Sequence, residues 1–424
     1  MYHLVKKLRL PALLFLLTAT ACRRQYEVEQ PSTAWSLYDA ATTPLPAGAG
    51  ARLEGVYNFS DGNDRFGSDA VLKWSYRVDG TDTSYTLSVF CQKAITYMLL
   101  HGKRVDSTIL LNGYWRSLEG TATGGVRLTI KDESGGRFVL GGAPTGVLLE
   151  GVYGVGTDAP ALPVRLAYDR PLYGGRPLEI VVHRGGAQTA DLPPASENSA
   201  EIIPYASLFG ATGIEIDVRL TSDGVPVLFH DEALSERLIV KNGMVGPIEN
   251  YSYAQLYSLV RLIRNGEHIP TLREALETVV TKTPIRFVWL DTKFHGDLQL
   301  LHSLQQEFMA RAAALGKPLE ILIGIPDQEV LDHFKNLPGY QDVPSVCELD
   351  PAKVQEANSR IWGPRWTLGL QNNEVAAVQA QGRRAFVWTI DLPENISLFV
   401  REGHFNGILT DYPTAVAYTY YVQR

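Results

Sequence analysis

The chain has 424 residues and a formal net charge of −7 at pH 7, and 45% of its residues are hydrophobic. This length exceeds what one ordinary hydrophobic core can hold, so we expect two domains. An acidic chain without basic runs argues against nucleic acid as a partner. Small molecules or cations fit this composition better.

Residues 1–21 have the pattern of a targeting segment. Three basic residues precede the apolar run 10–17, which is too short to span a bilayer. Residues 19–22, Ala-Thr-Ala-Cys, fit either an ordinary secretory cleavage site or a bacterial lipoprotein box. We favour the lipoprotein, because an unpaired thiol at the start of a cleaved chain has no other evident purpose. Lipid on Cys22 would tether an exported protein to the cell envelope, at the outer membrane or on its periplasmic side.

Two further segments precede the C-terminal half of the chain. Residues 22–50 are rich in Thr, Pro and Ala, as expected of a linker to a lipid anchor. Residues 51–172 contain short alternating runs separated by turn signals, which predicts an all-β antiparallel barrel or sandwich. This domain shows no catalytic pattern, so we expect a structural or ligand-binding role. Cys91 lies in this domain and Cys347 in the next, and both are expected to be buried thiols.

From residue 173 to 424 the pattern changes to strands that alternate with helical segments. This predicts an α/β (β/α)8 barrel of the TIM type, whose active site lies at the carboxyl ends of its strands. The expected strands are 178–182, 213–220, 285–290, 319–323, 343–347, 361, 385–389 and 407–410.

Two carboxylates lie two residues apart in the expected strand 213–220. Glu215 and Asp217 therefore project from the same face, and burying them together is costly unless a cation offsets their charge. The turn 222–224 is too short for a parallel crossover, so the following run must return antiparallel. This return brings His230 opposite Glu215 or Asp217.

Polar residues also follow two neighbouring strands. His183 and Arg184 come directly after the first strand, and Asp291 and Lys293 share a face at the end of the third. Each pair alone is more often structural, but their convergence on one barrel mouth favours a site. Hard carboxylate oxygens suit Ca²⁺ or Mg²⁺ better than zinc. The cations would accept an anionic substrate, and two histidines offer an acid and a base.

Taken together, these motifs resemble the glycerophosphodiester phosphodiesterase family. The resemblance covers about 178–415 and does not reach the β domain. It rests on segments 183–185, 196–199, 213–218, 221–224, 230–231, 269–272, 387–389 and 407–413. It implies a TIM barrel that uses a divalent metal to hydrolyse glycerophosphodiesters, which are small-molecule phosphodiesters, to an alcohol and glycerol phosphate. In such enzymes a neighbouring hydroxyl of the substrate can attack phosphorus first, and water then opens the cyclic phosphate.

The resemblance also implies a role for each matching residue. His183 and His230 would be the acid/base pair. Glu215, Asp217 and Asp291 would be metal ligands, with Glu197 as a further ligand. Arg184 would bind the phosphate, Lys293 would stabilise transition-state charge, and Trp388 would pack against the glycerol moiety or in the core. Two residues depart from the family pattern. Asp291 stands where a longer Glu is usual, which would shift or weaken the metal, and Ser199 replaces a Thr.

Two other functions stay open on the sequence. One is a phospholipase-type phosphodiesterase that acts on intact phospholipid or phosphoinositide, which membrane tethering would favour. The other is a binding protein that lost turnover through the Asp291 change. Retention of both His183 and His230 argues against the binding protein, because binding alone needs no acid/base pair.

Overall fold

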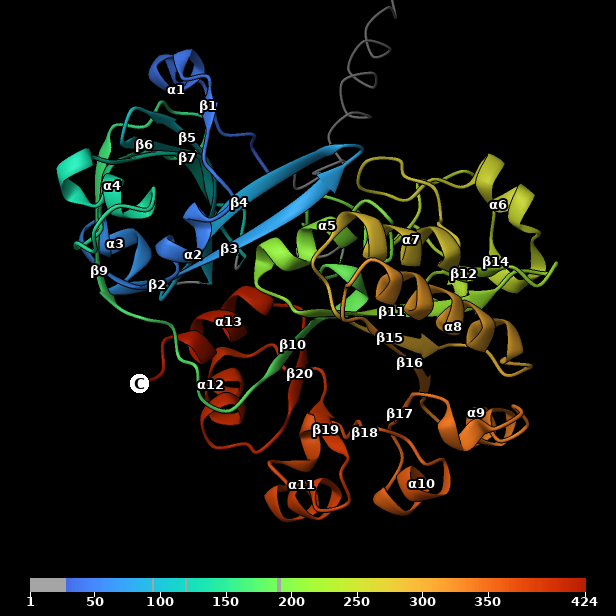
Figure 1. Cartoon of the computed structure of the whole chain (residues 1–424). Coiled ribbons are helices and arrows are strands. Elements are labelled where there is room, and N and C mark those ends of the chain that lie inside the picture. The colour runs from blue at the N-terminus through green and yellow to red at the C-terminus, as the bar shows by residue number, and fades with distance from the viewer. Residues whose placement is uncertain (1–27, 94, 119, 189–191) are drawn as a thin grey trace, which may run out of the picture.

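The computed structural model describes residues 28–424, apart from 94, 119 and 189–191. The predicted targeting segment and Cys22 lie outside these residues. Figure 1 shows two bodies side by side, an antiparallel barrel and a larger barrel surrounded by helices. No helix in the described part of the chain is both long and apolar enough to cross a membrane.

The N-terminal body is a closed antiparallel barrel of eight strands, so the alternating pattern forms a barrel rather than a sandwich. Each strand pairs with the next along the chain, and β9 pairs with β2 to close the sheet, which removes open edges. The strands are β2 (Gly55–Asp61), β3 (Asp69–Asp79), β4 (Asp82–Cys91), β5 (Thr96–Val105), β6 (Thr108–Ser117), β7 (Thr123–Ile130), β8 (Leu148–Tyr153) and β9 (Leu162–Arg170). Short helices α2 (Ala49–Leu53), α3 (Asn63–Phe66) and α4 (Gly136–Val139) accompany them.

Large side chains form the core of this barrel. Tyr57, Phe66 and Trp115 are fully buried in one apolar cluster, and the Trp115 indole donates a hydrogen bond of 2.8 Å to the Gly154 carbonyl. Part of the segment expected as a linker also contacts the barrel, because α1 (Ser36–Ala40) is followed by β1 (Thr43–Pro44), which pairs with β5. The barrel is thus a packed body with its own core.

The C-terminal body is a parallel eight-stranded barrel, as the alternating pattern predicts. β20 pairs with β10 and closes the sheet. The strands are β10 (Glu179–Val182), β11 (Gly213–Leu220), β15 (Phe287–Thr292), β16 (Glu320–Ile325), β17 (Ser345–Cys347), β18 (Ile361–Trp362), β19 (Arg384–Val387) and β20 (Gly407–Thr410). The helices are α5 (Ile203–Ala206), α7 (Leu272–Lys282), α8 (Gln299–Ala314), α9 (Gln328–Phe334), α10 (Pro351–Glu356), α11 (Asn372–Gln379), α12 (Pro393–Arg401) and α13 (Pro413–Tyr421). Cys91 and Cys347 are buried free thiols, which confirms the expectation for both.

The antiparallel return after β11 is present as predicted. β12 (Pro226–Leu228) pairs with β11, with Val218 opposite Leu228. The chain then forms an insertion that contains β13 (Ala233–Leu234), β14 (Gly246–Pro247) and α6 (Tyr253–Leu259). This insertion has a small apolar core of its own, so it is a folded unit at the barrel mouth.

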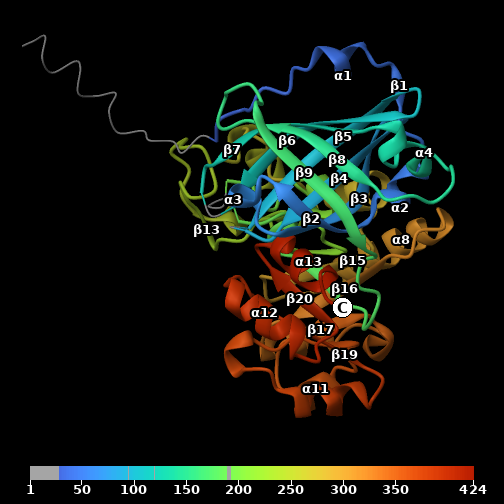
Figure 2. The same ribbon diagram turned by 90° about the vertical axis from the view of Figure 1, so that its left-hand side faces the viewer.

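The two barrels share one continuous apolar core. Between β10 and β11, the helical elements of the described residues are short turns, which include α5 and η4 (Ser207–Phe209), and strands β3 and β4 of the N-terminal barrel contact η4. The Ser88 hydroxyl donates to the Leu208 carbonyl at 2.7 Å, and the Tyr97 and Phe209 rings lie 5.4 Å apart. Figure 2 shows α13 directly beneath the same barrel, which it contacts through β3 and β4.

Gly210 offers a test of this interface. Its φ is +88°, and an added Cβ would lie 2.7 Å from Ala417 and 2.9 Å from the Phe90 ring. The matched control is Gly243, which has φ +83° and open space around it. We expect Gly243→Ala to cost about 1 kcal/mol of unfolding free energy through backbone strain, and Gly210→Ala to cost about 2 kcal/mol more through overpacking. Equal losses in denaturant unfolding would contradict the tight contact.

Candidate active site

Three carboxylates converge at the carboxyl ends of β11 and β15. Glu215 and Asp217 project from β11, and Asp291 lies opposite Asp217 in the parallel register. An oxygen from each of the three lies within 4.8 Å of the others. Glu215 Oε1, Asp217 Oδ1 and Asp291 Oδ1 are buried and take part in no hydrogen bond. The shared face predicted for Glu215 and Asp217 is therefore present, and Asp291 reaches the group despite its shorter side chain.

Lys293 supplies positive charge beside this group. Its ammonium lies 2.5 Å from Asp291 Oδ2 and 3.3 Å from Asp217 Oδ1. Burial, followed by repulsion from Asp217, raises the pKa of Glu215 to about 8. The Asp217 pKa is lowered, because Lys293 and His230 outweigh the burial that opposes it. One lysine does not balance three carboxylates, and their hard oxygens fit a divalent cation such as Ca²⁺ or Mg²⁺.

His183 lies directly after β10, in the short turn η2 (His183–Gly185). Its Nδ1 is 2.9 Å from Asp411 Oδ1, and its Nε2 is 3.8 Å from Glu215 Oε2. Asp411 follows β20 and also accepts a hydrogen bond of 2.6 Å from the Gln188 amide. Burial lowers the His183 pKa, but attraction to Asp411 and Glu215 outweighs it and raises the pKa to about 9.

His230 comes from the neighbouring hairpin, two residues after β12. The Phe229 amide donates to the Asp217 carbonyl at 3.1 Å, so Phe229 pairs with Asp217 and His230 comes one residue later. His230 Nδ1 is 2.9 Å from Asp231 Oδ1. Its pKa is lowered, because burial and the positive charges of Arg184 and Lys293 outweigh Asp217 and Asp231. Both histidines thus have Nδ1 bound to a carboxylate, which orients each ring and directs Nε2 away from that partner.

Arg184 is held close to the carboxylates by its backbone and its side chain. Its φ of +53° turns the chain, and its amide donates to Glu215 Oε2 at 2.9 Å. The guanidinium bonds Glu197 Oε1 at 2.7 Å, and its Nε lies 4.0 Å from Asp217. Arg184 is therefore beside the predicted metal ligands, as a phosphate-binding residue would need to be.

The structure places Glu197 differently from the sequence-based expectation. Its oxygens contact the guanidinium groups of Arg184 and Arg237, and it does not join the three-carboxylate group. The next residue contacts that group instead. Asn198 donates to Asp217 Oδ2 at 2.7 Å and accepts a hydrogen bond from the Asp217 amide. Two arginines neutralise the Glu197 charge here, which leaves it little reason to bind a metal ion.

Trp388 is half-buried at the end of β19. Its indole donates to the Gly363 carbonyl at 2.7 Å, and the Arg365 guanidinium covers its ring at 4.9 Å. Its ring packs against the apolar cluster inside the barrel, so its contacts are those of a core residue that lies near the barrel mouth.

Sequence reasoning assigned no role to several residues that the fold brings to the site. These are Asn198, Asp231, Arg237, Glu348 and Asp411. Glu348 directly follows β17, and burial together with repulsion from Asp291 raises its pKa well above the usual range. Asp411 and Glu348 each follow a barrel strand, and that position was the available signal for both.

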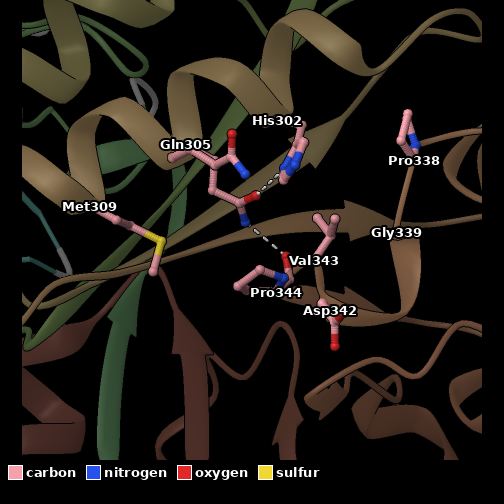
Figure 3. A pocket seen from close by; sticks show the side chains of 9 residues that line it. His302, Gln305, Met309, Pro338, Gly339, Asp342, Val343 and Pro344 are labelled. Atoms are coloured by element: carbon pink, nitrogen blue, oxygen red, sulfur yellow. Dashed lines mark hydrogen bonds between the residues drawn. The ribbon is translucent and has the colours of Figure 1, made fainter.

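A cavity of about 530 Å³ lies away from these residues, between α8 and the segment that enters β17. Figure 3 shows His302, Gln305 and Pro344 on its wall joined by hydrogen bonds. His302 contacts Gln305 at 3.1 Å, and the Gln305 amide donates to the Pro344 carbonyl at 2.8 Å. The hydrogen bonds of Gln305 therefore tie α8 to the segment that enters β17.

The sequence model of the glycerophosphoryl diester phosphodiesterase family matches residues 183–343. This region of the chain is similar to that family. The matched region begins at His183 and contains both histidines and all three clustered carboxylates. Asp411 and Trp388 come from the remainder of the barrel, and the N-terminal β-barrel lies outside the match.

Curated relatives carry the same name. The chain is 34% identical over 137 residues to glycerophosphodiester phosphodiesterase 1 of Rattus norvegicus. This alignment covers 31% of this chain and 39% of the relative. The chain thus spans about two fifths of the length of that protein. It is 22% identical over 242 residues to a glycerophosphodiester phosphodiesterase of Caldanaerobacter subterraneus, covering 55% of this chain and 94% of the relative.

Solved structures of glycerophosphodiester phosphodiesterases also align with this chain. One from Agrobacterium tumefaciens is 20% identical with a TM-score of 0.46, covering 57% of this chain and 97% of that one. A phosphodiesterase from Oleispira antarctica, solved in complex with the product sn-glycerol-3-phosphate, is 21% identical with a TM-score of 0.44, covering 56% and 94%.

Proposed function

We propose that this chain is a metal-dependent phosphoric diester hydrolase that converts glycerophosphodiesters to an alcohol and glycerol phosphate. The observation that carries the proposal is the pair His183 and His230. Each is oriented by a carboxylate at Nδ1, and each interacts with the group of three carboxylates, His183 with Glu215 and His230 with Asp217. A binding site for a metal or a phosphate alone has no need of two oriented imidazoles.

Glu215, Asp217 and Asp291 are the residues that would hold the ion, since each has one buried oxygen without a hydrogen bond. When bound, the ion would act as a Lewis acid that polarises a phosphoryl oxygen of the substrate. Arg184 and Lys293 add positive charge beside the same group and stabilise the charge that develops on the phosphate. Asn198 fixes the orientation of Asp217 through two hydrogen bonds.

The histidines move the protons. His230, whose pKa is lowered, takes the proton from the attacking hydroxyl, which is that of the substrate glycerol in the first step. His183, whose pKa is raised, gives a proton to the departing alcohol oxygen. Water then opens the cyclic phosphate with the two roles exchanged, so each histidine ends the cycle in its starting form.

The assay that tests the proposal uses glycerophosphocholine with Ca²⁺ or Mg²⁺ and measures release of choline and glycerol phosphate. Intact phospholipid and phosphoinositide are assayed in parallel. Faster turnover of the deacylated diester is the expected result. Exclusive turnover of the intact lipids would favour the phospholipase alternative, and binding without any turnover would favour the binding protein.

We also propose that lipid on Cys22 anchors the protein to the cell envelope. The support is the basic and apolar segment before it and the small residues at 19–21. Fractionation of cells that express the full chain tests this: the protein should sediment with membranes, and Cys22→Ala should release it.

Asp231→Asn gives a prediction with a definite sign on pH. The Asp231 hydrogen bond raises the His230 pKa, so its loss should lower that pKa further. Because His230 must be neutral to accept a proton, the acidic limb of the kcat/KM profile should move to lower pH. The plateau should fall by about 10² to 10⁴, because the ring loses its fixed tautomer. An unmoved acidic limb would show that His230 does not set it.

A further inference from the structure

We infer that Arg237 is a positioning residue for this reaction, because it bridges the carboxylate that orients His230 and the carboxylate that holds Arg184. The inference rests on the proposed function and adds a residue from the insertion after β12. It also gives Glu197 a role other than metal binding.

The geometry of the bridge is specific. Arg237 faces Glu197 with two nitrogens, Nη1 to Oε2 at 3.1 Å and Nη2 to Oε1 at 3.0 Å. It faces Asp231 with two nitrogens as well, Nε to Oδ2 at 3.0 Å and Nη2 to Oδ1 at 2.6 Å. Four contacts from one planar guanidinium fix both carboxylates relative to each other, which a lysine ammonium cannot do.

Each of these carboxylates has a second partner in the site. Glu197 bonds the Arg184 guanidinium at 2.7 Å, and Asp231 bonds His230 Nδ1 at 2.9 Å. The result is a chain of alternating charges that runs from Arg184 through Glu197, Arg237 and Asp231 to His230. It joins the loop after β10 to the loop after β12, so the two halves of the site are held in register by side chains.

The position of Arg237 argues against a purely structural role. Its side chain is 40% exposed, whereas Glu197 is 1% exposed and Asp231 is 23% exposed. An exposed ion pair on the surface contributes little to folding stability. Here the exposed arginine instead bridges two carboxylates that contact Arg184 and His230, and its loss would remove two contacts from Glu197 and two from Asp231.

Removing Arg237 should shift the His230 pKa in the direction opposite to Asp231→Asn. The charged groups that face His230 are Asp217, Arg184, Asp231 and Lys293, and Arg219 donates to its backbone carbonyl. Arg237 holds the Asp231 pKa well below its usual range. Without it, the Asp231 carboxylate stabilises the imidazolium more strongly.

The experiment compares Arg237→Gln, Arg237→Lys and Lys241→Gln in the full chain with glycerophosphocholine. Arg237→Gln should lower kcat/KM about 10- to 100-fold and move the acidic limb to higher pH. Arg237→Lys keeps the positive charge but loses the forked guanidinium. Its acidic limb should therefore lie where the parent's does, while its kcat/KM should lie between those of Arg237→Gln and the parent. Lys241 is the matched control, because it pairs with exposed Glu236 in the same insertion and should change neither quantity.

Glu197→Gln separates the two roles available to Glu197. Metal affinity measured by calorimetry should stay within about twofold of the parent chain, while KM rises because Arg184 loses its partner. A large loss of metal affinity would return Glu197 to the ligand set and overturn this part of the inference.

The outcomes are distinct from a failure of the proposed function. No turnover by the parent chain would remove the function itself. If the parent chain turns over and Arg237→Gln keeps kcat/KM within twofold of the parent with an unmoved acidic limb, only the role of Arg237 is overturned. Should Arg237→Gln fail to fold, Arg237→Lys decides, since full activity there would show that the bridging geometry is unimportant.

Discussion

Replacement of His230 or of His183 by alanine should lower kcat for glycerophosphocholine by about 10² to 10⁴. Each histidine carries one proton transfer in each of the two steps of the proposed mechanism, so neither can stand in for the other. In that mechanism Arg184, Lys293 and the metal bind the substrate, so KM should change much less than kcat. Stopped assays of choline release measure both quantities.

The matched control for this experiment is His404→Ala, an exposed histidine away from the site whose backbone carbonyl accepts from Gln379. It should keep the parent rate. The double variant His183→Ala/His230→Ala should lose less than the product of the two single losses, because groups that act as a unit are not additive. Undiminished turnover in either single variant would exclude acid/base catalysis by this pair.

Asp217→Asn should abolish most of the metal affinity and the activity together. Asp217 is fully buried, and asparagine keeps its shape and can still accept from Asn198, so the fold is expected to survive. Loss of one carboxylate from three should weaken Ca²⁺ or Mg²⁺ binding by at least about a hundredfold. Calorimetry on the purified chain measures the affinity directly, without reference to turnover.

Chelation provides the second half of this test. Dialysis against EDTA should remove activity from the parent chain, and the added ion should restore it. Asp223→Asn serves as the control, because Asp223 lies in the exposed turn after β11, where it accepts hydrogen bonds from the Thr221 hydroxyl and the Tyr253 amide. Activity that persists after exhaustive chelation would contradict metal dependence.

The fold of the C-terminal half could be predicted because each strand is a short apolar run with a clear boundary. The expected strands 213–220 and 407–410 match β11 and β20 at both ends. The turn at 222–224 fixed the direction of β12 for the same reason, since three residues permit only a hairpin. Local chemistry and chain geometry suffice for such features.

The positions of Asp411, Arg237 and Glu197 could not be predicted in this way. Asp411 reaches His183 across 228 residues of sequence, and the Arg237 bridge depends on how the insertion after β12 folds. Glu197 was expected as a further metal ligand because segment 196–199 resembles a motif of the family. Its arginine partners come from separate loops, and only the folded chain shows that they neutralise it.

The core shared by the two barrels has a consequence for how the protein melts. Phe90 and Tyr97 of the N-terminal barrel lie in the same apolar cluster as Phe209 and α13 of the C-terminal barrel. Neither barrel can lose its structure without exposing apolar surface of the other, so calorimetry should show one cooperative transition rather than two. A recombination event that removed the N-terminal barrel would therefore require new apolar cover over η4 and α13 before the C-terminal barrel could fold.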